Sequence, residues 1–242
     1  QTPKAESFNV SKDGDKSIVK VTYRFPQVDA QWEITYKVFA NGIIKVDNRF
    51  VAEGTETPMI PRVGLRMQLS EILNDLTYYG RGPEENYRDR RTSQFIGEYT
   101  TPIKDLYEPY IRPQENEHRT DIYWCALTTK QKAGLLFIAD RTFELNASNY
   151  LLGSLDSGET IDNGAPRTNE TNHRHLTDPQ PVKQVDMFID YRMMGVGGDN
   201  SWGAIAHEPY LIRPGVENAI EYGFSIVPFD KKADYKNLIY QY

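Results

Sequence analysis

The chain has 242 residues, a formal net charge of −6 and one cysteine. We expect one domain over residues 1–242 rather than two, and the acidic balance argues against a nucleic-acid partner, since the arginines of 81–91 are interleaved with Glu84, Glu85 and Asp89. No apolar run is long enough to cross a membrane, so we expect a soluble protein, in a cytoplasmic or periplasmic compartment that the sequence leaves unknown.

Short apolar or alternating runs recur between turn signals and predict strands. In chain order these runs are 17–25, 32–40, 43–50, 63–69, 76–79, 122–129, 135–139, 185–193, 210–213 and 220–227. This rhythm is typical of a large antiparallel β-sandwich, an all-β fold. Asn41 and Gly42 between the second and third runs predict a hairpin with a type I′ turn. Helical periodicity is weak and is limited to 103–107 and the tail 231–242, where Asp230 would be the N-cap.

Two long polar segments, 79–117 and 153–181, interrupt these runs. Loops of such length in a compact domain are usually functional or disordered. The first is rich in Tyr, Arg and Pro and is expected to be ordered, whereas 155–172 is rich in Gly, Asp, Thr and Asn and is expected to be a mobile insertion. Cys125 lies in an apolar run, which predicts a buried thiol.

The most informative segment is the glycine-rich loop that follows the eighth run. Gly197 and Gly198 can adopt positive φ, and Asp199 and Asn200 can hydrogen-bond to their own backbone, so the loop is shaped to present Trp202. An indole is a flat apolar face that suits the C–H face of a sugar ring. A Trp202 that folds back into the core remains the alternative.

Other polar groups offer weaker chemistry. Glu84 and Glu85 are adjacent carboxylates, but a glycosidase needs two carboxylates about 5 to 9 Å apart, and adjacency in a charged loop favours a structural role. His173 and His175 would share one face of an extended chain, as metal ligands can. No third ligand stands at a supporting spacing, so hydrogen-bonded imidazoles are favoured and no metal site is predicted.

Four motifs in this order resemble the C-terminal, small-chain domain of family 2 β-galactosidases of the bacterial lactose-hydrolysing type. They are Gly80–Arg90, Tyr107–Asn116, Asn172–Leu176 and Gly195–Trp202. The resemblance covers about residues 16–228 and leaves 229–242 as a C-terminal tail. It implies a large antiparallel super-sandwich similar to galactose mutarotases.

The resemblance also implies where the chemistry lies. The two catalytic glutamates of the family stand on a TIM barrel, and the alternating βα pattern of a barrel is absent from this sequence. The chain is therefore expected to hold no catalytic residue and no cofactor, and to work with a TIM-barrel domain or large chain that commonly binds Mg and Na. A β-galactoside such as lactose would be the substrate of the whole enzyme.

Individual residues take their expected roles from the same resemblance. Trp202 matches the tryptophan that stacks on the sugar in the aglycone subsite, supported by the turn of Gly197, Gly198, Asp199 and Asn200. A second group falls in matching motifs without a known substrate contact, and structural cross-links between loops are expected of it: Glu85, Asn86, Arg88, His173 and His175.

The family's domain normally begins further upstream, so we expect a fragment that lacks its first strands, exposes sheet edges and self-associates, with a homo-oligomer left open. Two other functions are weighed. An aldose 1-epimerase would use a His and a Glu in a concave sheet as acid and base. A lectin-like module would bind free sugar weakly through Trp202 and tyrosine rings.

Overall fold

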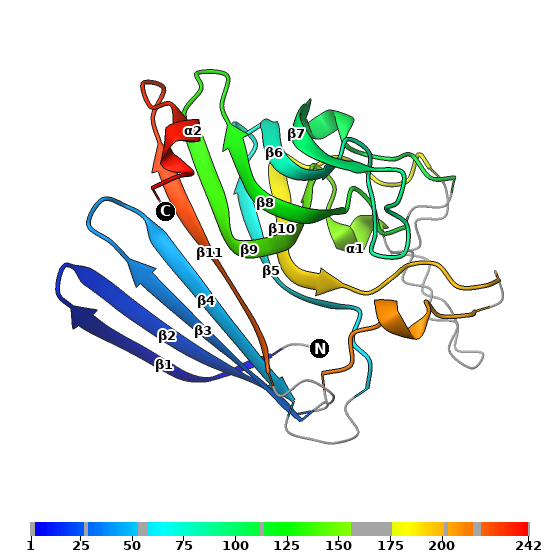
Figure 1. Ribbon diagram of the computed structural model, residues 1–242, viewed down its shortest axis with the longest axis horizontal. Coiled ribbons are helices and arrows are strands. Elements are labelled where there is room, and N and C mark those ends of the chain that lie inside the picture. Colours follow the sequence, from blue (N-terminus) through cyan, green and yellow to red (C-terminus); the bar gives the residue numbers. More distant parts are fainter. Residues whose placement is uncertain are drawn as a thin grey trace.

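The computed structural model describes residues 3–26, 29–52, 58–111, 114–155, 176–200, 203–214 and 219–241. Within these ranges lie eleven strands and a few short helical turns, which confirms the predicted all-β class (Figure 1). The strands are β1 (Lys4–Asp13), β2 (Lys16–Phe25), β3 (Ala30–Val38), β4 (Ile44–Ala52), β5 (Arg62–Ser70), β6 (Asp75–Gly82), β7 (Phe95–Pro102), β8 (Arg119–Thr128), β9 (Gly134–Ser148), β10 (Gln184–Met193) and β11 (Ile220–Phe229).

The strands form one antiparallel sheet whose main path runs β1-β2-β3-β4-β11-β9-β8-β6-β7. Strand β9 is 15 residues long and joins two parts of the sheet. Its first half pairs with β11 and its last residues pair with β10, which in turn pairs with β5. Figure 1 shows the result: β1–β4 spread as a fan, while β8, β9 and β10 curve away from it.

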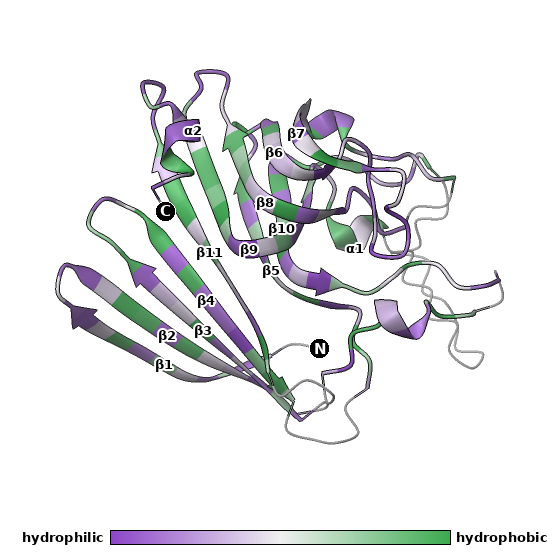
Figure 2. Ribbon diagram, viewed as in Figure 1, coloured by the Kyte–Doolittle hydropathy of each residue, from purple (hydrophilic) through white to green (hydrophobic). Residues whose placement is uncertain are grey.

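The main core lies along the curved part of the sheet, where apolar side chains of β8 to β11 meet. Figure 2 shows hydrophobic residues along these strands. Among its fully buried members are Ile122, Phe137, Phe143, Met187 and Phe224. Cys125 belongs to this cluster, is fully buried and is a free thiol, so the prediction for it is confirmed. Burial raises the pKa of the Cys125 thiol, which keeps it protonated and unreactive.

The predicted hairpin between β3 and β4 is present, but the predicted turn type is wrong. Phe39 N–H donates to the Ile43 carbonyl at 2.9 Å and Gly42 N–H to the Phe39 carbonyl at 3.0 Å, so the loop holds three residues. Gly42 has φ of 84° and Asn41 has no positive φ, whereas a type I′ turn needs both. A β-turn followed by a left-handed glycine is the three-residue alternative.

Several boundaries differ from the sequence prediction. Residues 210–213 form no strand, because Glu208–Tyr210 is a short 3₁₀ turn followed by extended chain. Strands β1 and β7 are additional, and both lie at sheet edges where few apolar residues are needed. The turn at Ile103–Asp105 is confirmed.

The tail contains one helical turn, α2 (Tyr235–Leu238), capped by Asp234 and not by Asp230. Asp230 instead accepts hydrogen bonds from the N–H groups of Lys232 and Ala233 in the preceding turn. A second turn, α1 (Leu152–Leu155), precedes the part of 155–172 that lies outside the described residues. No described helix has the length and apolar character needed to span a membrane.

Candidate functional site

The glycine loop leaves the end of β10 and is tied to its neighbours through the backbone. Met194 N–H donates to the Pro61 carbonyl at 2.9 Å, and Gly195 N–H donates to the Tyr210 carbonyl at 2.8 Å. These bonds attach the start of the loop to the chain before β5 and to the segment that follows the loop. The loop therefore begins from a rigid base.

Asp89 provides the next anchor, although it lies more than a hundred residues away in sequence. Its Oδ1 accepts from Val196 N–H at 3.2 Å and its Oδ2 from Gly197 N–H at 2.8 Å. A Cβ on Gly195 would lie 2.5 Å from Asp89 Oδ2, so the carboxylate can approach only because residue 195 is a glycine. The first and last of the four motifs are thus in direct contact.

The glycines of the loop serve a purpose different from the predicted one. Gly197 and Gly198 do not adopt positive φ, and within the described part of the loop it is Gly203, with φ of 99°, that does. Gly198 is needed for a close approach, since a Cβ there would lie 2.1 Å from the Ala204 carbonyl oxygen. The two limbs of the loop therefore pack backbone to backbone.

The tip of the loop is only partly described. Asp199 Oδ1 lies 2.7 Å from His207 Nε2, both side chains are exposed, and Asn200 is also described. Trp202 lies outside the described residues, and so do His173 and His175. Their predicted roles stay predictions.

Glu85 and Asn86 lie in the loop that carries Asp89. Glu85 Oε1 accepts from Arg90 at 2.5 Å and from the Tyr110 hydroxyl, and its Oε2 accepts from Glu117 N–H at 2.9 Å. Glu84, its neighbour, is exposed. The carboxylate of Glu85 thus joins the first motif to the second.

Asn86 is fully buried and all its hydrogen-bonding capacity is used. Its Nδ2 donates to the carbonyls of Arg81 and Glu84, both at 3.0 Å. Its Oδ1 accepts from Thr120 N–H at 3.0 Å and from the Thr120 hydroxyl at 2.6 Å. A buried amide satisfied in this way fixes the conformation of the loop around it.

A buried polar network that the sequence analysis did not single out lies beneath this loop. His118 is fully buried, with Nε2 3.0 Å from Glu144 Oε2 and Nδ1 2.8 Å from Asn146 Oδ1. Glu144 also accepts from Arg88 at 3.1 Å and from Met193 N–H at 2.7 Å. Glu144 therefore connects the Arg88 loop to the last residue of β10, where the glycine loop begins.

The pKa values of His118 and Glu144 are shifted by their contacts with each other and with their neighbours. Burial alone would lower the pKa of His118, but the hydrogen bond and charge of Glu144 outweigh burial and raise it. Burial likewise opposes the charge of Glu144, yet its bonds to His118 and Met193 lower its pKa. Both shifts favour the charged forms of His118 and Glu144, which lie in contact as a buried pair.

Two other buried carboxyls behave in the opposite way. Burial raises the pKa of Glu117 to about 8, and the charge of Arg119 opposes this shift only in part. Neither carboxyl oxygen of Glu117 has a hydrogen-bond partner among the described residues. Burial raises the pKa of Asp190 to about 7, although Arg62 lies 2.9 Å away.

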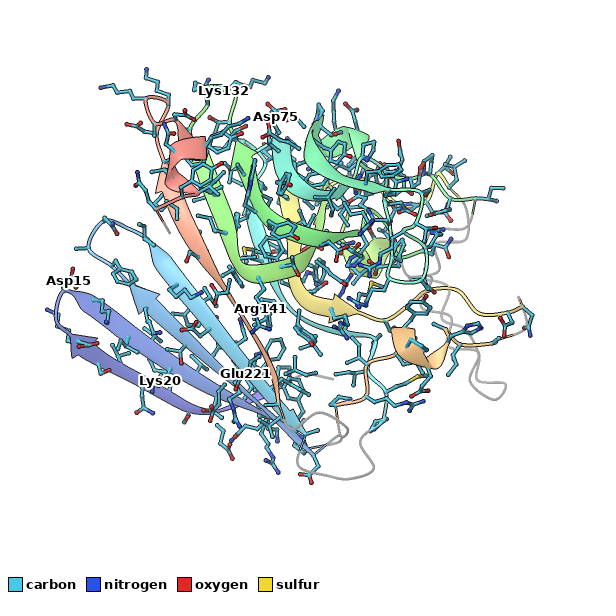
Figure 3. All side chains as sticks on the ribbon, viewed as in Figure 1. Asp15, Lys20, Asp75, Lys132, Arg141 and Glu221 are labelled. Carbon is cyan, nitrogen blue, oxygen red and sulfur yellow. The ribbon has the colours of Figure 1, made fainter. Side chains whose placement is uncertain are left out.

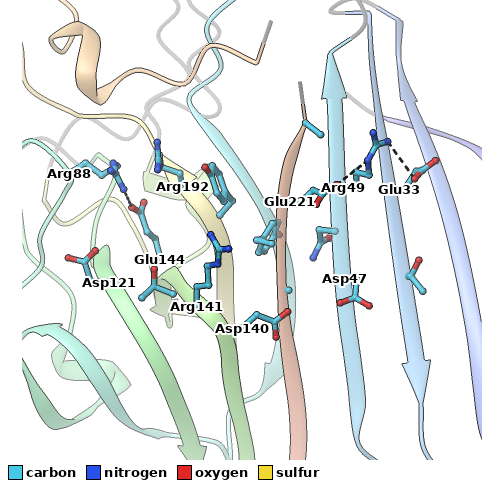
Figure 4. A pocket seen from close by; sticks show the side chains of 17 residues that line it. Glu33, Asp47, Arg49, Arg88, Asp121, Asp140, Arg141, Glu144, Arg192 and Glu221 are labelled. Carbon is cyan, nitrogen blue, oxygen red and sulfur yellow. Dashed lines mark hydrogen bonds and ion pairs between the residues drawn. The ribbon is translucent and has the colours of Figure 1, made fainter. Parts of the chain in front are cut away.

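A groove of about 790 Å³ opens beside the network, and it is called the central groove below (Figure 4). It lies where β9 leaves β11 and joins β10, at the exposed residues Asp140, Arg141 and Thr142. Figure 3 shows Arg141 and Glu221 in the middle of the molecule, between the fan and the curved part. In the described ranges, no group of three or more His, Cys, Asp or Glu is placed to hold a metal ion.

Residues 1–226 match a family model described as the β-galactosidase small chain. The chain belongs to this family. Among similar curated proteins, a β-galactosidase of Priestia megaterium is 31% identical over 207 residues, covering 86% of this chain and 18% of the relative. A β-galactosidase of Streptococcus thermophilus is 30% identical over 214 residues, covering 84% of this chain and 19% of the relative. The chain thus spans about a fifth of the length of these relatives.

Solved structures include a more distant similarity. A GH36 α-galactosidase, AgaA of Geobacillus stearothermophilus, aligns with a TM-score of 0.44 and 10% identity over 95% of this chain and 28% of that one. The small-chain family therefore rests on the sequence matches.

Proposed function

We propose that this chain is the accessory small-chain part of a family 2 β-galactosidase and contributes Trp202 to the aglycone subsite of an active site on a separate TIM barrel. The observation that carries the proposal is the family match over residues 1–226. Relatives named β-galactosidase are about five times longer, which leaves most of their length for a catalytic domain. Terminal β-galactosides such as lactose are the proposed substrates.

The described part of the glycine loop supports this role for Trp202. A residue that stacks on a substrate must be held in one position, because each ordered loop residue costs conformational entropy. Asp89 binds two successive N–H groups of the loop, and Gly198 packs against the backbone of Ala204. This construction favours a loop ordered before substrate arrives.

The catalytic step is proposed to lie outside this chain. A retaining or inverting glycosidase needs two carboxyls free to face the sugar. The buried carboxylates of Glu85 and Glu144 are instead held by Arg90 and by His118. We propose that the isolated chain does not hydrolyse galactosides and that the Mg and Na of such enzymes are bound by the catalytic domain.

The test is the change Trp202→Ala in the full-length enzyme. An aromatic platform contributes on the order of 1 to 3 kcal/mol, so the KM for lactose should rise roughly 5- to 150-fold. A galactoside with a small leaving group should be hydrolysed almost normally, because its aglycone does not reach the indole. Trp202→Phe, which keeps an aromatic face, should recover part of the loss.

Two results would contradict the proposal. Unchanged lactose kinetics in Trp202→Ala would remove Trp202 from the subsite. Turnover of an aryl galactoside by the pure isolated chain, above host-enzyme controls, would place the catalytic residues here.

A further inference from the structure

The central groove exists because the sheet divides along β9. Residues 134–139 of β9 pair with β11, and residues 144–148 pair with β10. Between them Asp140, Arg141 and Thr142 are exposed, whereas residues 143–148 are buried. Side chains of the fan and of β10 therefore face each other across a space of about 790 Å³.

The carboxylates on the fan side of this groove are paired with cations of the same sheet, and Glu33 and Glu221 share one of them, Arg49. Asp47 and Glu221 accept from Lys37 at 2.8 Å and from Arg49 at 3.2 Å. Asp140 is bonded to Lys45. These charges offer little to a ligand, because each already has its partner.

The opposite side carries excess positive charge. Arg141 and Arg192 line the groove and pair with no carboxylate among the residues that the structure describes. Figure 4 shows them beside Arg88, which comes from the loop and shares Glu144 with His118. Three guanidinium groups from three separate segments thus line this side of the groove.

Two of these guanidinium groups also have unused buried donors. The Nε atoms of Arg88 and Arg192 are buried and lack a hydrogen-bond partner. Arg192 is held in place by its contact with the Tyr191 ring, with its Cζ 4.9 Å from the ring centroid. These two atoms are shielded from a ligand in the groove, so the terminal nitrogens of the guanidinium groups are the donors that the proposal below uses.

We propose that the central groove binds an acidic sugar, whose carboxylate or sulfate group is held by Arg88, Arg141 and Arg192. The guanidinium fork matches such groups geometrically, and a site of this volume accommodates a small ligand. Thr142, which is exposed, supplies a neutral polar group for a sugar hydroxyl. Because the chain as a whole has a net charge of −6, it does not attract anions in general. An attraction for anions would therefore be confined to these arginines.

The experiment uses the full-length protein and isothermal titration with three probes: galacturonate, galactose 6-sulfate and neutral galactose. At least one acidic sugar should bind about tenfold or more tightly than galactose at the groove, and the affinity should fall with added NaCl. A stronger response to one acidic probe distinguishes a carboxylate from a sulfate ligand.

Variants separate the groove from any other sugar site on the full-length protein. Arg141→Gln and Arg192→Gln should each weaken the acidic sugar by about tenfold and leave neutral galactose unchanged. Arg192→Lys keeps the charge but loses the forked guanidinium group. Its affinity for the acidic sugar should lie between that of the Gln variants and that of the parent protein. Lys130→Gln removes a positive charge from a different cavity and should have no effect.

Each of the remaining outcomes overturns the proposal. Equal binding of galacturonate, galactose 6-sulfate and galactose would show that charge is not recognised. Binding that survives Arg141→Gln and Arg192→Gln would belong to another site. The absence of binding of either acidic sugar at millimolar concentration, with an unchanged melting temperature in all variants, would leave the groove without this ligand.

Discussion

Replacing Glu117 by Gln should make the chain more stable, by an amount that depends on pH. Glu117 is buried, its carboxyl oxygens have no hydrogen-bond partner among the described residues, and burial raises its pKa to about 8 from an ordinary value of 4.5. Between these two values the folded state holds a proton that the unfolded state releases. Stability of the parent protein therefore falls as pH rises from about 4.5 to about 8.

The magnitude follows from proton linkage. One bound proton corresponds to about 1.4 kcal/mol per pH unit, so the cost of Glu117 grows to a few kcal/mol by pH 8 and is constant above it. Gln has nearly the same shape and does not ionise. The stability difference between Glu117→Gln and the parent should therefore be nearly constant below pH 4.5 and should widen across this window.

Urea unfolding of the isolated chain from pH 4 to pH 9 measures this difference. Glu84→Gln, a change at an exposed carboxylate of the neighbouring loop, is the control and should give a flat difference. Asp190, whose pKa is also raised, is present in all three proteins, so its contribution cancels in the comparison. A pH-independent difference for Glu117→Gln would refute the reasoning, because Glu117 would then be ionised in the folded protein.

Other predictions concern the loops. In the full-length enzyme, Asp89→Ala leaves the N–H groups of Val196 and Gly197 without their acceptor, so the lactose KM should rise severalfold while a galactoside with a small leaving group is spared. Asp89→Asn should restore part of the effect, and an equal loss on both substrates would contradict a positioning role. Lys132, with φ of 65°, occupies the place of Gly42 in a turn with the same hydrogen bonds. Lys132→Gly should stabilise the chain by up to about 1 kcal/mol and Gly42→Ala should destabilise it by about 1 to 2 kcal/mol, both measured by thermal unfolding, and shifts in the same direction would exclude this explanation.

The strands of the core were predictable because their apolar content is a property of each segment by itself. Strand β10 marks the limit of this approach. Its alternation predicts a polar outer face at Asp186 and Asp190, yet both residues are buried. Arg66 binds Asp186 at 2.7 Å and Arg62 pairs with Asp190 at 2.9 Å, both from β5. A hydropathy pattern describes how readily each side chain leaves water by itself. It contains no information about a charged partner that lies over a hundred residues away in the sequence.

The candidate site shows the same limit. The glycine loop was recognisable from its composition, although Gly197 and Gly198 do not adopt the positive φ expected of them. Its anchor Asp89 was not, because the contact depends on how β10 and the 80–90 loop meet in space. The predicted polar loop ends at residue 117, and His118 directly after it, to which the sequence prediction gave no role, is fully buried. Polar residues directly before an apolar strand can indicate a buried network of this kind. The sequence alone does not identify them, because it does not show which distant residues are their partners.

The position of β11 in the sheet has a consequence for synthesis of the protein. One edge of strand β4 stays unpaired until β11 has been synthesised. Phe50 of β4 pairs with Ile220 of β11, which lies 170 residues later in the chain. At ordinary translation rates this interval is roughly 10 to 30 seconds. During that time the open edge of β4 carries alternating charges at Lys45, Asp47 and Arg49, which disfavour pairing with another nascent chain. Asp47 and Arg49, which line the groove in the folded chain, are thus also charges that disfavour wrong pairing at this edge before β11 arrives.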